Sequence, residues 1–201
     1  MGDIMISVLL SVQPRWVDKI CTVIGERNGL PVYEKEDEVR KTRPNVSVPF
    51  KVYIYETKGR TDTPWVDEDG HTIYKGRGQV IGHFICNRMT YIAARVDDHG
   101  EKHLENTAFL RTCLTNLELF NYLYREGGRC SGWAWHISAL KIYDKPRELS
   151  EFKRPCPVGD CQECKFALWQ TNTFISESKI VGCTQKIKAP QSWCYVYESE
   201  I

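Results

Sequence analysis

One charged stretch does most to decide how this chain is interpreted: Tyr33-Glu-Lys-Glu-Asp-Glu-Val-Arg-Lys-Thr-Arg-Pro44. Nearly every side chain in it is charged or polar, unlike those of a buried strand, so we expect an exposed ribbon. If the ribbon is extended, Glu38 and Arg40 share one face, because successive side chains point to opposite sides. Lys41 and Arg43 then share the other face. The ribbon holds four cations within nine residues: Lys35, Arg40, Lys41 and Arg43.

Length and composition allow one large soluble domain or two small ones. The chain has 201 residues, of which 42% are hydrophobic and 11% aromatic, enough for a sizeable core. Lysine plus arginine (27) nearly balances aspartate plus glutamate (26), so an anion site must come from local clustering. The apolar runs are shorter than the ~20 residues of a membrane helix, and the first residues lack the basic segment of a signal peptide. We therefore expect a cytoplasmic protein that does not associate with membranes.

The rest of the sequence alternates strand patterns with two helical patterns. Apolar residues recur on one side of a helix that begins at Pro14: Trp16, Val17, Ile20, Val23 and Ile24. A second helix is expected over 112–124, and residues 58–78 are expected to form an inserted polar loop. Strands are expected over 4–12, 51–57, 79–89, 133–143 and 192–198, with Pro146 ending the fourth of them.

Motifs in the order of a known family run through most of the chain. Lys35-Glu-Asp-Glu-Val-Arg40 matches the Lys-x-x-Glu-x-Arg part of the Gly-x-Lys-x-x-Glu-x-Arg signature of ASCH domains. Other matching blocks are Ser11-Val-Gln-Pro14, Lys51-Val-Tyr-Ile-Tyr55, Trp135-His-Ile-Ser138 and Pro190-Gln-Ser-Trp-Cys-Tyr-Val196. The chain thus resembles an ASCH domain protein of the PUA-like superfamily, in the subgroup seen in phage and prophage genomes. It departs from the signature at Tyr33, which stands at the position of the glycine.

The resemblance implies an α+β fold, a PUA-like mixed β-barrel of about five or six strands with two or more helices. It also implies a single domain over residues 1–201, with the inserted loop at 58–78 and a Cys-rich insertion at 153–188. The oligomeric state is not indicated by the sequence.

The function implied by the resemblance is binding of RNA or another nucleic acid, or of a modified nucleoside, in a basic cleft of the barrel. Aromatic side chains in the strands include candidates for stacking on a base, and Trp193 is chosen because it follows the Pro-Gln-Ser turn. The expected ligand-binding residues are Lys35, Glu38, Arg40, Lys41, Arg43 and Trp193. A mixed-charge, solvated strand without a ligand is the plain alternative for the ribbon.

An enzymatic alternative comes from the resemblance to ASCH proteins that act as amidohydrolases of N4-acetylcytidine, which use a lysine, a threonine three residues later and a distant glutamate. The glutamate is not placed, although Glu101, Glu105 and Glu118 lie in the region where it would fall. Lys35 fits the lysine, while Glu38 occupies the threonine position, so the two form a candidate catalytic pair or a structural salt bridge. Hydrolysis of RNA is a further possibility, with His83, His136 and Arg40 as candidates. Both histidines lie in apolar strands, where a hydrogen-bonded core histidine is the alternative. A phage accessory protein that binds a protein partner is the third hypothesis.

The nine cysteines fall into two groups, and an odd count argues against a full set of disulfides. Five are scattered among apolar neighbours and are expected to be reduced: Cys21, Cys86, Cys113, Cys130 and Cys194. The other four follow a C-x4-C-x2-C pattern with one cysteine further on: Cys156, Cys161, Cys164 and Cys183. This spacing favours a structural zinc site, with free thiols or a redox pair as the alternatives.

Overall fold

The computed structural model describes residues 6–59, 65–66, 72–73, 75–126, 130–153, 167–172, 177–183 and 188–198. The two helices are α1 (Pro14–Cys21) and α2 (Asn116–Leu123), and a short 3-10 helix, η1, spans Leu149–Glu151. The main sheet contains β1 (Ile6–Val12), β4 (Asp37–Arg40), β5 (Phe50–Glu56), β8 (Val80–Val96), β9 (Lys102–Glu105), β10 (Ser131–Arg147), β11 (Phe152–Lys153) and β14 (Trp193–Glu198). Three pairs form separate sheets: β2 (Val23–Arg27) with β3 (Leu30–Tyr33), β6 (Trp65–Val66) with β7 (Thr72–Ile73), and β12 (Ala167–Asn172) with β13 (Glu177–Cys183).

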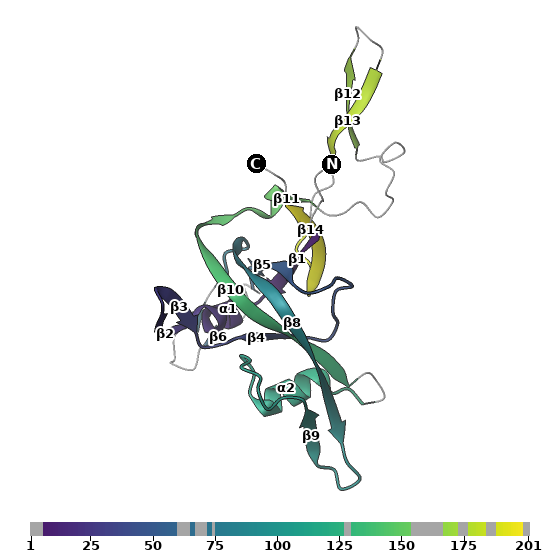
Figure 1. The fold of residues 1–201 in the computed structure, drawn as a ribbon. Coiled ribbons are helices and arrows are strands. Elements are labelled where there is room, and N and C mark those ends of the chain that lie inside the picture. The colour runs from purple at the N-terminus through teal and green to yellow at the C-terminus, as the bar shows by residue number, and fades with distance from the viewer. Residues whose placement is uncertain are drawn as a thin grey trace.

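The main sheet is mixed, which confirms the α+β class (Figure 1). Its strands run in the order β11-β14-β1-β5-β8-β10-β4, and β9 pairs with β8 outside this path. The pair β1–β5 is parallel, and the other pairs of the sheet are antiparallel. Within the described residues no pairing joins β4 to β11, so the closed barrel is not seen. The sheet has eight strands, more than the five or six that were expected.

Two long strands, β8 and β10, form the twisted centre of the fold (Figure 1). Each has 17 residues and extends beyond the expected bounds of 79–89 and 133–143. Pro146 was expected to end the second of them, but β10 continues to Arg147. The pairing with β8 shifts between Ile142 and Arg147, and such an irregularity accommodates a proline that has no N–H to donate.

Side chains on the two faces of the strands build separate parts of the core. Val17 and Ile20 of α1 pack in one cluster with residues that include Leu10, Ile54 and Trp135. On the other side of β4 and β10, a second cluster joins the sheet to α2: Val39, Ile92, Ala134, Leu119, Phe120 and Leu123. Because side chains alternate along β4, Val39 faces α2 while its neighbours Glu38 and Arg40 face away from that cluster.

The first helix is shorter than its apolar pattern predicted. It ends at Cys21, and Val23 and Ile24 lie on β2 with 53% and 55% of their surfaces exposed. The physical reason is the Asn28-Gly29 turn, in which both residues have positive φ values of 53° and 76°. An Asn-Gly pair in this conformation closes a tight hairpin, here between β2 and β3, and the hairpin competes with continuation of the helix.

The charged ribbon is not exposed throughout, contrary to the expectation from its composition. Asp37 and Glu38 are only 2% and 7% exposed, because β4 pairs with β10 and places Glu38 opposite the buried Trp135. The strand also ends at Arg40, so the alternation of faces does not continue to Arg43.

The five scattered cysteines are free thiols, as expected: Cys21, Cys86, Cys113, Cys130 and Cys194. Of the predicted zinc ligands, Cys156, Cys161 and Cys164 lie outside the described residues. Cys183 is the last residue of β13, and its side chain is not described. The zinc site and the Cys-rich insertion at 153–188 therefore stay predictions, as does the inserted loop at 58–78, which is described only in part. None of the described helices is long and apolar enough to span a membrane.

Candidate functional site: a cavity lined by Glu38 and Arg40

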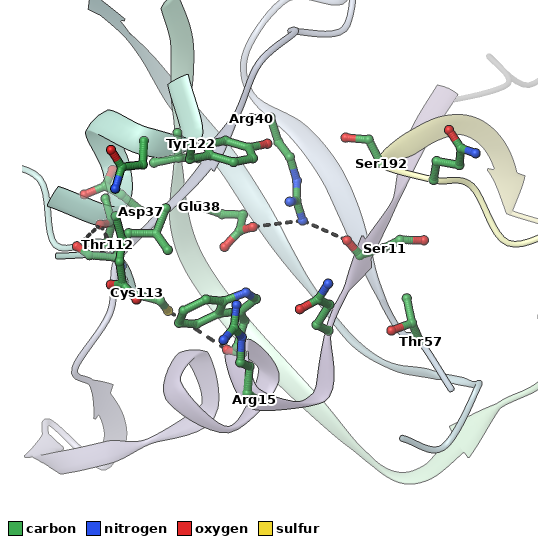
Figure 2. A pocket seen from close by; sticks show the side chains of 17 residues that line it. Ser11, Arg15, Asp37, Glu38, Arg40, Thr57, Thr112, Cys113, Tyr122 and Ser192 are labelled. Carbon is green, nitrogen blue, oxygen red and sulfur yellow. Dashed lines mark hydrogen bonds and ion pairs between the residues drawn. The ribbon is translucent and has the colours of Figure 1, made fainter. Parts of the chain in front are cut away.

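A cavity of about 630 Å³ lies where five segments of the chain meet (Figure 2). These are the end of β1 with the start of α1, strand β4, Thr57 after β5, residues 112–122, and residues 191–192. The side chains that matter below are Ser11, Arg15, Trp16, Asp37, Glu38, Arg40, Thr112, Cys113, Glu118, Tyr122 and Ser192. The volume falls in the range of pockets that bind small organic ligands.

Glu38 and Arg40 form a buried ion pair in this cavity. Nη2 of Arg40 lies 2.8 Å from Oε1 of Glu38 and also donates a 2.8 Å hydrogen bond to the backbone carbonyl of Ser11 (Figure 2). The side chain of Arg40 is 14% exposed and that of Glu38 is 9% exposed. They meet because residues two apart on a strand share a face. The bond to Ser11 then ties the edge strand β4 to the end of β1 across the cavity.

Several polar atoms of the cavity lining retain unused hydrogen-bonding capacity. Within the described residues, Nε of Arg40 and Oδ1 of Asp37 are buried and have no hydrogen-bond partner. Oε1 of Glu38 forms the ion pair with Arg40, and Oε2 has no hydrogen-bond partner within the described residues. Buried polar groups are almost always satisfied, so unused atoms around a cavity indicate a ligand or ordered water.

Burial raises the pKa of Glu38, and the nearby charge of Arg40 opposes this rise. The lining as a whole is not basic, because Asp37, Glu38 and Glu118 accompany only two arginines, Arg15 and Arg40. The cleft with an excess of positive charge that was expected is therefore not seen at this cavity. Such an interior disfavours a phosphate and suits a neutral polar ligand, because a buried charge requires a partner of opposite sign.

Two aromatic side chains line the cavity, and a cationic side chain lies over each ring. The guanidinium of Arg15 lies 4.1 Å from the ring centroid of Trp16, and Nζ of Lys41 lies 5.1 Å from that of Tyr122. Aromatic rings and guanidinium planes are the surfaces on which single bases stack. The cavity therefore combines flat stacking surfaces with a buried polar pair.

One wall of the cavity is held in place by Asp37. Its Oδ2 accepts a 3.0 Å hydrogen bond from the backbone N–H of Arg111, next to Thr112 and Cys113 of the lining. The adjoining helix α2 begins with a capping box in which Thr115 and Glu118 satisfy each other's backbone N–H groups. Oδ1 of Asp37 lies 3.5 Å from Nδ1 of His136, which is too long for a good hydrogen bond and forms an ion pair only if His136 is protonated.

The cysteine in the lining is not a nucleophile at neutral pH. Burial raises the pKa of Cys113 to about 12, with the charge of Glu38 as a smaller cause. The thiolate is the reactive form of cysteine, and almost none is present at such a pKa. Cysteine chemistry is therefore not expected in this cavity.

The structure brings together only part of the predicted site. Glu38 and Arg40 meet in the cavity, while Lys35 lies outside it, where its amine pairs with Glu34. Lys35 lines two smaller pockets of about 310 and 340 Å³. Lys41 and Arg43 are exposed beyond the end of β4, and Arg43 lies 4.7 Å from the ring centroid of Trp133.

Trp193 is packed rather than open for stacking. Its Nε1 donates a 3.0 Å hydrogen bond to the hydroxyl of Thr42, and its ring contacts Trp135 and Tyr195 at centroid distances of 6.0 and 5.4 Å. It is partly buried against the core and does not line the cavity. The histidines proposed for RNA hydrolysis are also outside the lining. His83 instead contacts the hydroxyl of Tyr143 at 2.9 Å.

Sequence reasoning named Glu118 only as one of three candidates for a catalytic glutamate and missed the other residues that the two helices contribute to the site. Glu118, Asn121 and Tyr122 are spaced at i, i+3 and i+4, so they form one side of α2. That spacing was a usable signal, because the apolar stripe of the same helix lies elsewhere. Arg15 and Trp16, by contrast, carry no local pattern that distinguishes a cavity wall from an ordinary helix start.

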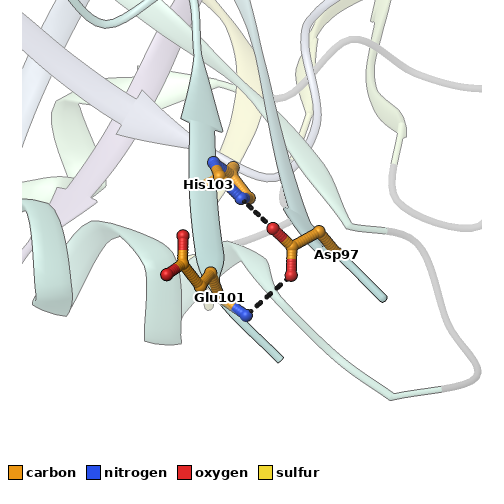
Figure 3. Close-up of side chains that lie close together, drawn as sticks. All are labelled: Asp97, Glu101 and His103. Carbon is orange, nitrogen blue, oxygen red and sulfur yellow. Dashed lines mark hydrogen bonds and ion pairs between the residues drawn. The ribbon is translucent and has the colours of Figure 1, made fainter. Parts of the chain in front are cut away.

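A second group of side chains at the turn between β8 and β9 has the composition of a metal site (Figure 3). Ligand atoms of Asp97, Glu101 and His103 all lie within 4.8 Å of one another. However, Oδ1 of Asp97 accepts hydrogen bonds from the backbone N–H groups of His99 and Glu101, and its Oδ2 lies 2.7 Å from Nε2 of His103. These contacts close the turn and account for the position of Asp97 without a cation.

Comparison with protein-family models gives no match, and neither does comparison with curated proteins. Among solved structures, a similar one is the crystal structure of a mutant form of the ZmASCH protein from Zymomonas mobilis. The TM-score is 0.44 and the sequence identity 14%, and the similarity covers 71% of this chain and 76% of that chain. It is a distant similarity in the path of the backbone.

Proposed function

We propose that this chain binds RNA or another nucleic acid, or a modified nucleoside, by taking one base into the cavity lined by Glu38 and Arg40. The observation that carries the proposal is the buried ion pair at the cavity, in which Nε of Arg40 has no hydrogen-bond partner and only Oε1 of Glu38 is engaged. A buried charged pair is expensive to maintain and is weak evidence for stability on its own. Its position in a cavity of about 630 Å³ is explained by a ligand that completes its hydrogen bonds.

The charges inside the cavity favour a base over a phosphate. Three carboxylates and two guanidinium groups leave no excess positive charge to hold an anion. A base is neutral and flat, and it presents hydrogen-bond donors and acceptors along its edge. It can stack on Tyr122, or on the guanidinium of Arg15 where this lies over Trp16.

Cations outside the cavity support a chain of nucleotides rather than a free nucleoside. Lys41 and Arg43 are exposed on either side of Thr42, immediately after Arg40. Each lies over an aromatic ring, Tyr122 for Lys41 and Trp133 for Arg43. Exposed cations next to aromatic surfaces are typical of proteins that bind single strands, where they contact the phosphates. We therefore propose phosphate contacts at Lys41 and Arg43 and base contacts in the cavity.

The test is a titration of fluorescently labelled single-stranded and duplex RNA and DNA, followed by fluorescence polarisation at two salt concentrations. The variant Tyr122→Leu removes a stacking surface worth ~1–3 kcal/mol, so binding should weaken by about 5-fold to 150-fold. The double variant Lys41→Ala/Arg43→Ala should weaken binding and reduce its salt dependence.

The matched control is Arg95→Ala, which removes an exposed cation paired with Glu105 on the hairpin β8–β9. It should leave the affinity unchanged. Absence of binding to every labelled strand and to free nucleosides would refute the proposal. Equal losses in Arg95→Ala and in the Lys41/Arg43 variant would show that general charge, and not this site, attracts the nucleic acid.

A further inference from the structure

The buried carboxylate in the cavity also limits which base can enter. Glu38 lies at the cavity with its Oε1 engaged by Arg40, and Oε2 has no contact within the described part of the chain. An ionised carboxylate can only accept hydrogen bonds. A ligand atom that meets Oε2 must therefore donate one.

Arg40 supplies the opposite polarity beside this acceptor. Its Nη2 is fully used by Glu38 and the carbonyl of Ser11, whereas Nε and Nη1 make no described hydrogen bond. A guanidinium has donors only. The cavity thus presents an acceptor from Glu38 next to donors from Arg40, held together by their 2.8 Å contact.

We propose that Glu38 makes this site specific for bases with an exocyclic amino group, which donates to Oε2 while a ring acceptor lies toward Arg40. The inference rests on the proposed function, because it specifies the base that the cavity takes. Amino groups of adenine and cytosine are donors, and each has an acceptor nitrogen beside it. In uracil and hypoxanthine a carbonyl replaces the amino group and the ring nitrogen beside it carries a hydrogen. In the same pose the carbonyl acceptor would face Oε2 and the N–H donor would face Arg40.

Bases with a carbonyl at this position should bind weakly, because the carboxylate of Glu38 would lose its water without gaining a hydrogen bond. A site built around a hydrogen-bonding group discriminates strongly against a ligand that lacks the partner, because its own buried polar atoms are left unpaired. A base that fills the cavity covers Oε2 of the nearly buried Glu38, so water cannot then replace the missing donor. One mismatched contact of this kind corresponds to about tenfold in affinity or more.

Two matched ligand pairs test the inference, since the members of each pair differ only at one edge, where the amino group becomes a carbonyl and the ring nitrogen beside it gains a hydrogen. These are cytidine against uridine and adenosine against inosine, each placed at the centre of an otherwise abasic short strand. Dissociation constants are measured by fluorescence polarisation for the wild-type chain, for Glu38→Gln and for Tyr122→Leu. Thermal unfolding of each variant confirms that it is folded.

The wild-type chain should bind the amino member of each pair about tenfold more tightly or better. Glu38→Gln has nearly the same shape but can donate, so this preference should vanish or reverse. Tyr122→Leu should weaken both members of a pair by similar factors, since stacking does not read the edge of the base.

Equal binding of both members by the wild-type chain would overturn the inference and leave the proposed function standing. A preference that persists in Glu38→Gln would show that another residue selects the base, and it too would overturn the inference. If no strand binds at all, both the inference and the proposed function fail.

Discussion

Replacement of Arg40 by methionine should destabilise the fold more than any other single change at the cavity. The substitution keeps most of the side-chain length but removes the charge that compensates Glu38, whose side chain is 9% exposed. Breaking a buried ion pair by removing one partner costs ~3–5 kcal/mol, and the carbonyl of Ser11 also loses its donor. We expect a loss of about 3 kcal/mol, at the lower end of this range, because Oε2 lies at the cavity and can bind water.

The double variant Glu38→Gln/Arg40→Met separates the charge from the other effects. Glutamine preserves the shape of Glu38 and removes the uncompensated charge, so part of the lost stability should return. We expect the double variant to be ~1–2 kcal/mol more stable than Arg40→Met alone, which is a typical coupling for residues in contact.

The loss in Arg40→Met should also depend on pH. Burial raises the pKa of Glu38 and the charge of Arg40 opposes this, so removal of Arg40 raises the pKa further. A carboxyl with a raised pKa in the folded state contributes stability that is fully present below its unfolded pKa, ~4.3 for glutamate. That stability is lost as the pH rises through the folded pKa. The deficit of Arg40→Met should therefore be smaller near pH 5 than near pH 7.5.

The assay is urea unfolding followed by tryptophan fluorescence at several pH values, for the wild type and both variants. Arg95→Met serves as the control, since its pair with Glu105 is exposed and such pairs contribute ~0–1 kcal/mol. A loss below about 1 kcal/mol in Arg40→Met, or a loss that does not change with pH, would refute the reasoning that Glu38 is a buried charge held by Arg40.

Three further predictions concern other parts of the chain. Gly82→Ala should destabilise the fold by ~1–3 kcal/mol in urea unfolding, because a Cβ there would lie 2.4 Å from the carbonyl oxygen of Lys141 and push β8 from β10. An unchanged midpoint of unfolding would contradict this close approach. Cys113, whose pKa burial raises to about 12, should resist iodoacetamide in the folded chain and react after unfolding, as followed by mass spectrometry; rapid labelling of the folded chain would show that the thiol is accessible. If the predicted zinc site exists, elemental analysis should find about one zinc per chain and a loss of zinc in Cys161→Ser; zinc-free protein of unchanged stability would exclude the site.

The fold was predictable where local patterns and tertiary packing agree. Alternation of apolar and polar side chains located the strands β5 and β14 within a residue or two. It underestimated β10, whose ends Ser131-Gly132 and Asp144-Lys-Pro-Arg147 carry residues typical of loops, and β8, whose mostly apolar residues 90–96 were not assigned to a strand. Strand length there is set by the pairing of β8 with β10 and β9, which involves residues far apart in the chain.

The candidate site was predictable only in its central pair. The signature spacing that pointed to Glu38 and Arg40 acts over three residues of one strand, and the structure does bring the two side chains together. The spacing also pointed to Lys35, which lies three residues before Glu38 and just outside β4. Its amine turns instead to the neighbouring Glu34, a contact that no pattern in the sequence distinguishes.

By itself the sequence determined the approximate positions of the two helices and of five strands of the main sheet, since side-chain periodicity and turn residues act over a few neighbours. It also determined that Glu38 and Arg40 share a face. Tertiary structure alone decided that this face is buried and lines a cavity, because the cover comes from α1, α2 and residues 191–192, which are remote in the chain. Burial, in turn, changes the chemistry of the pair. A carboxylate and a guanidinium that would be solvated on an exposed ribbon become a desolvated acceptor and donor, with the pKa of Glu38 raised and hydrogen-bonding atoms left for a ligand.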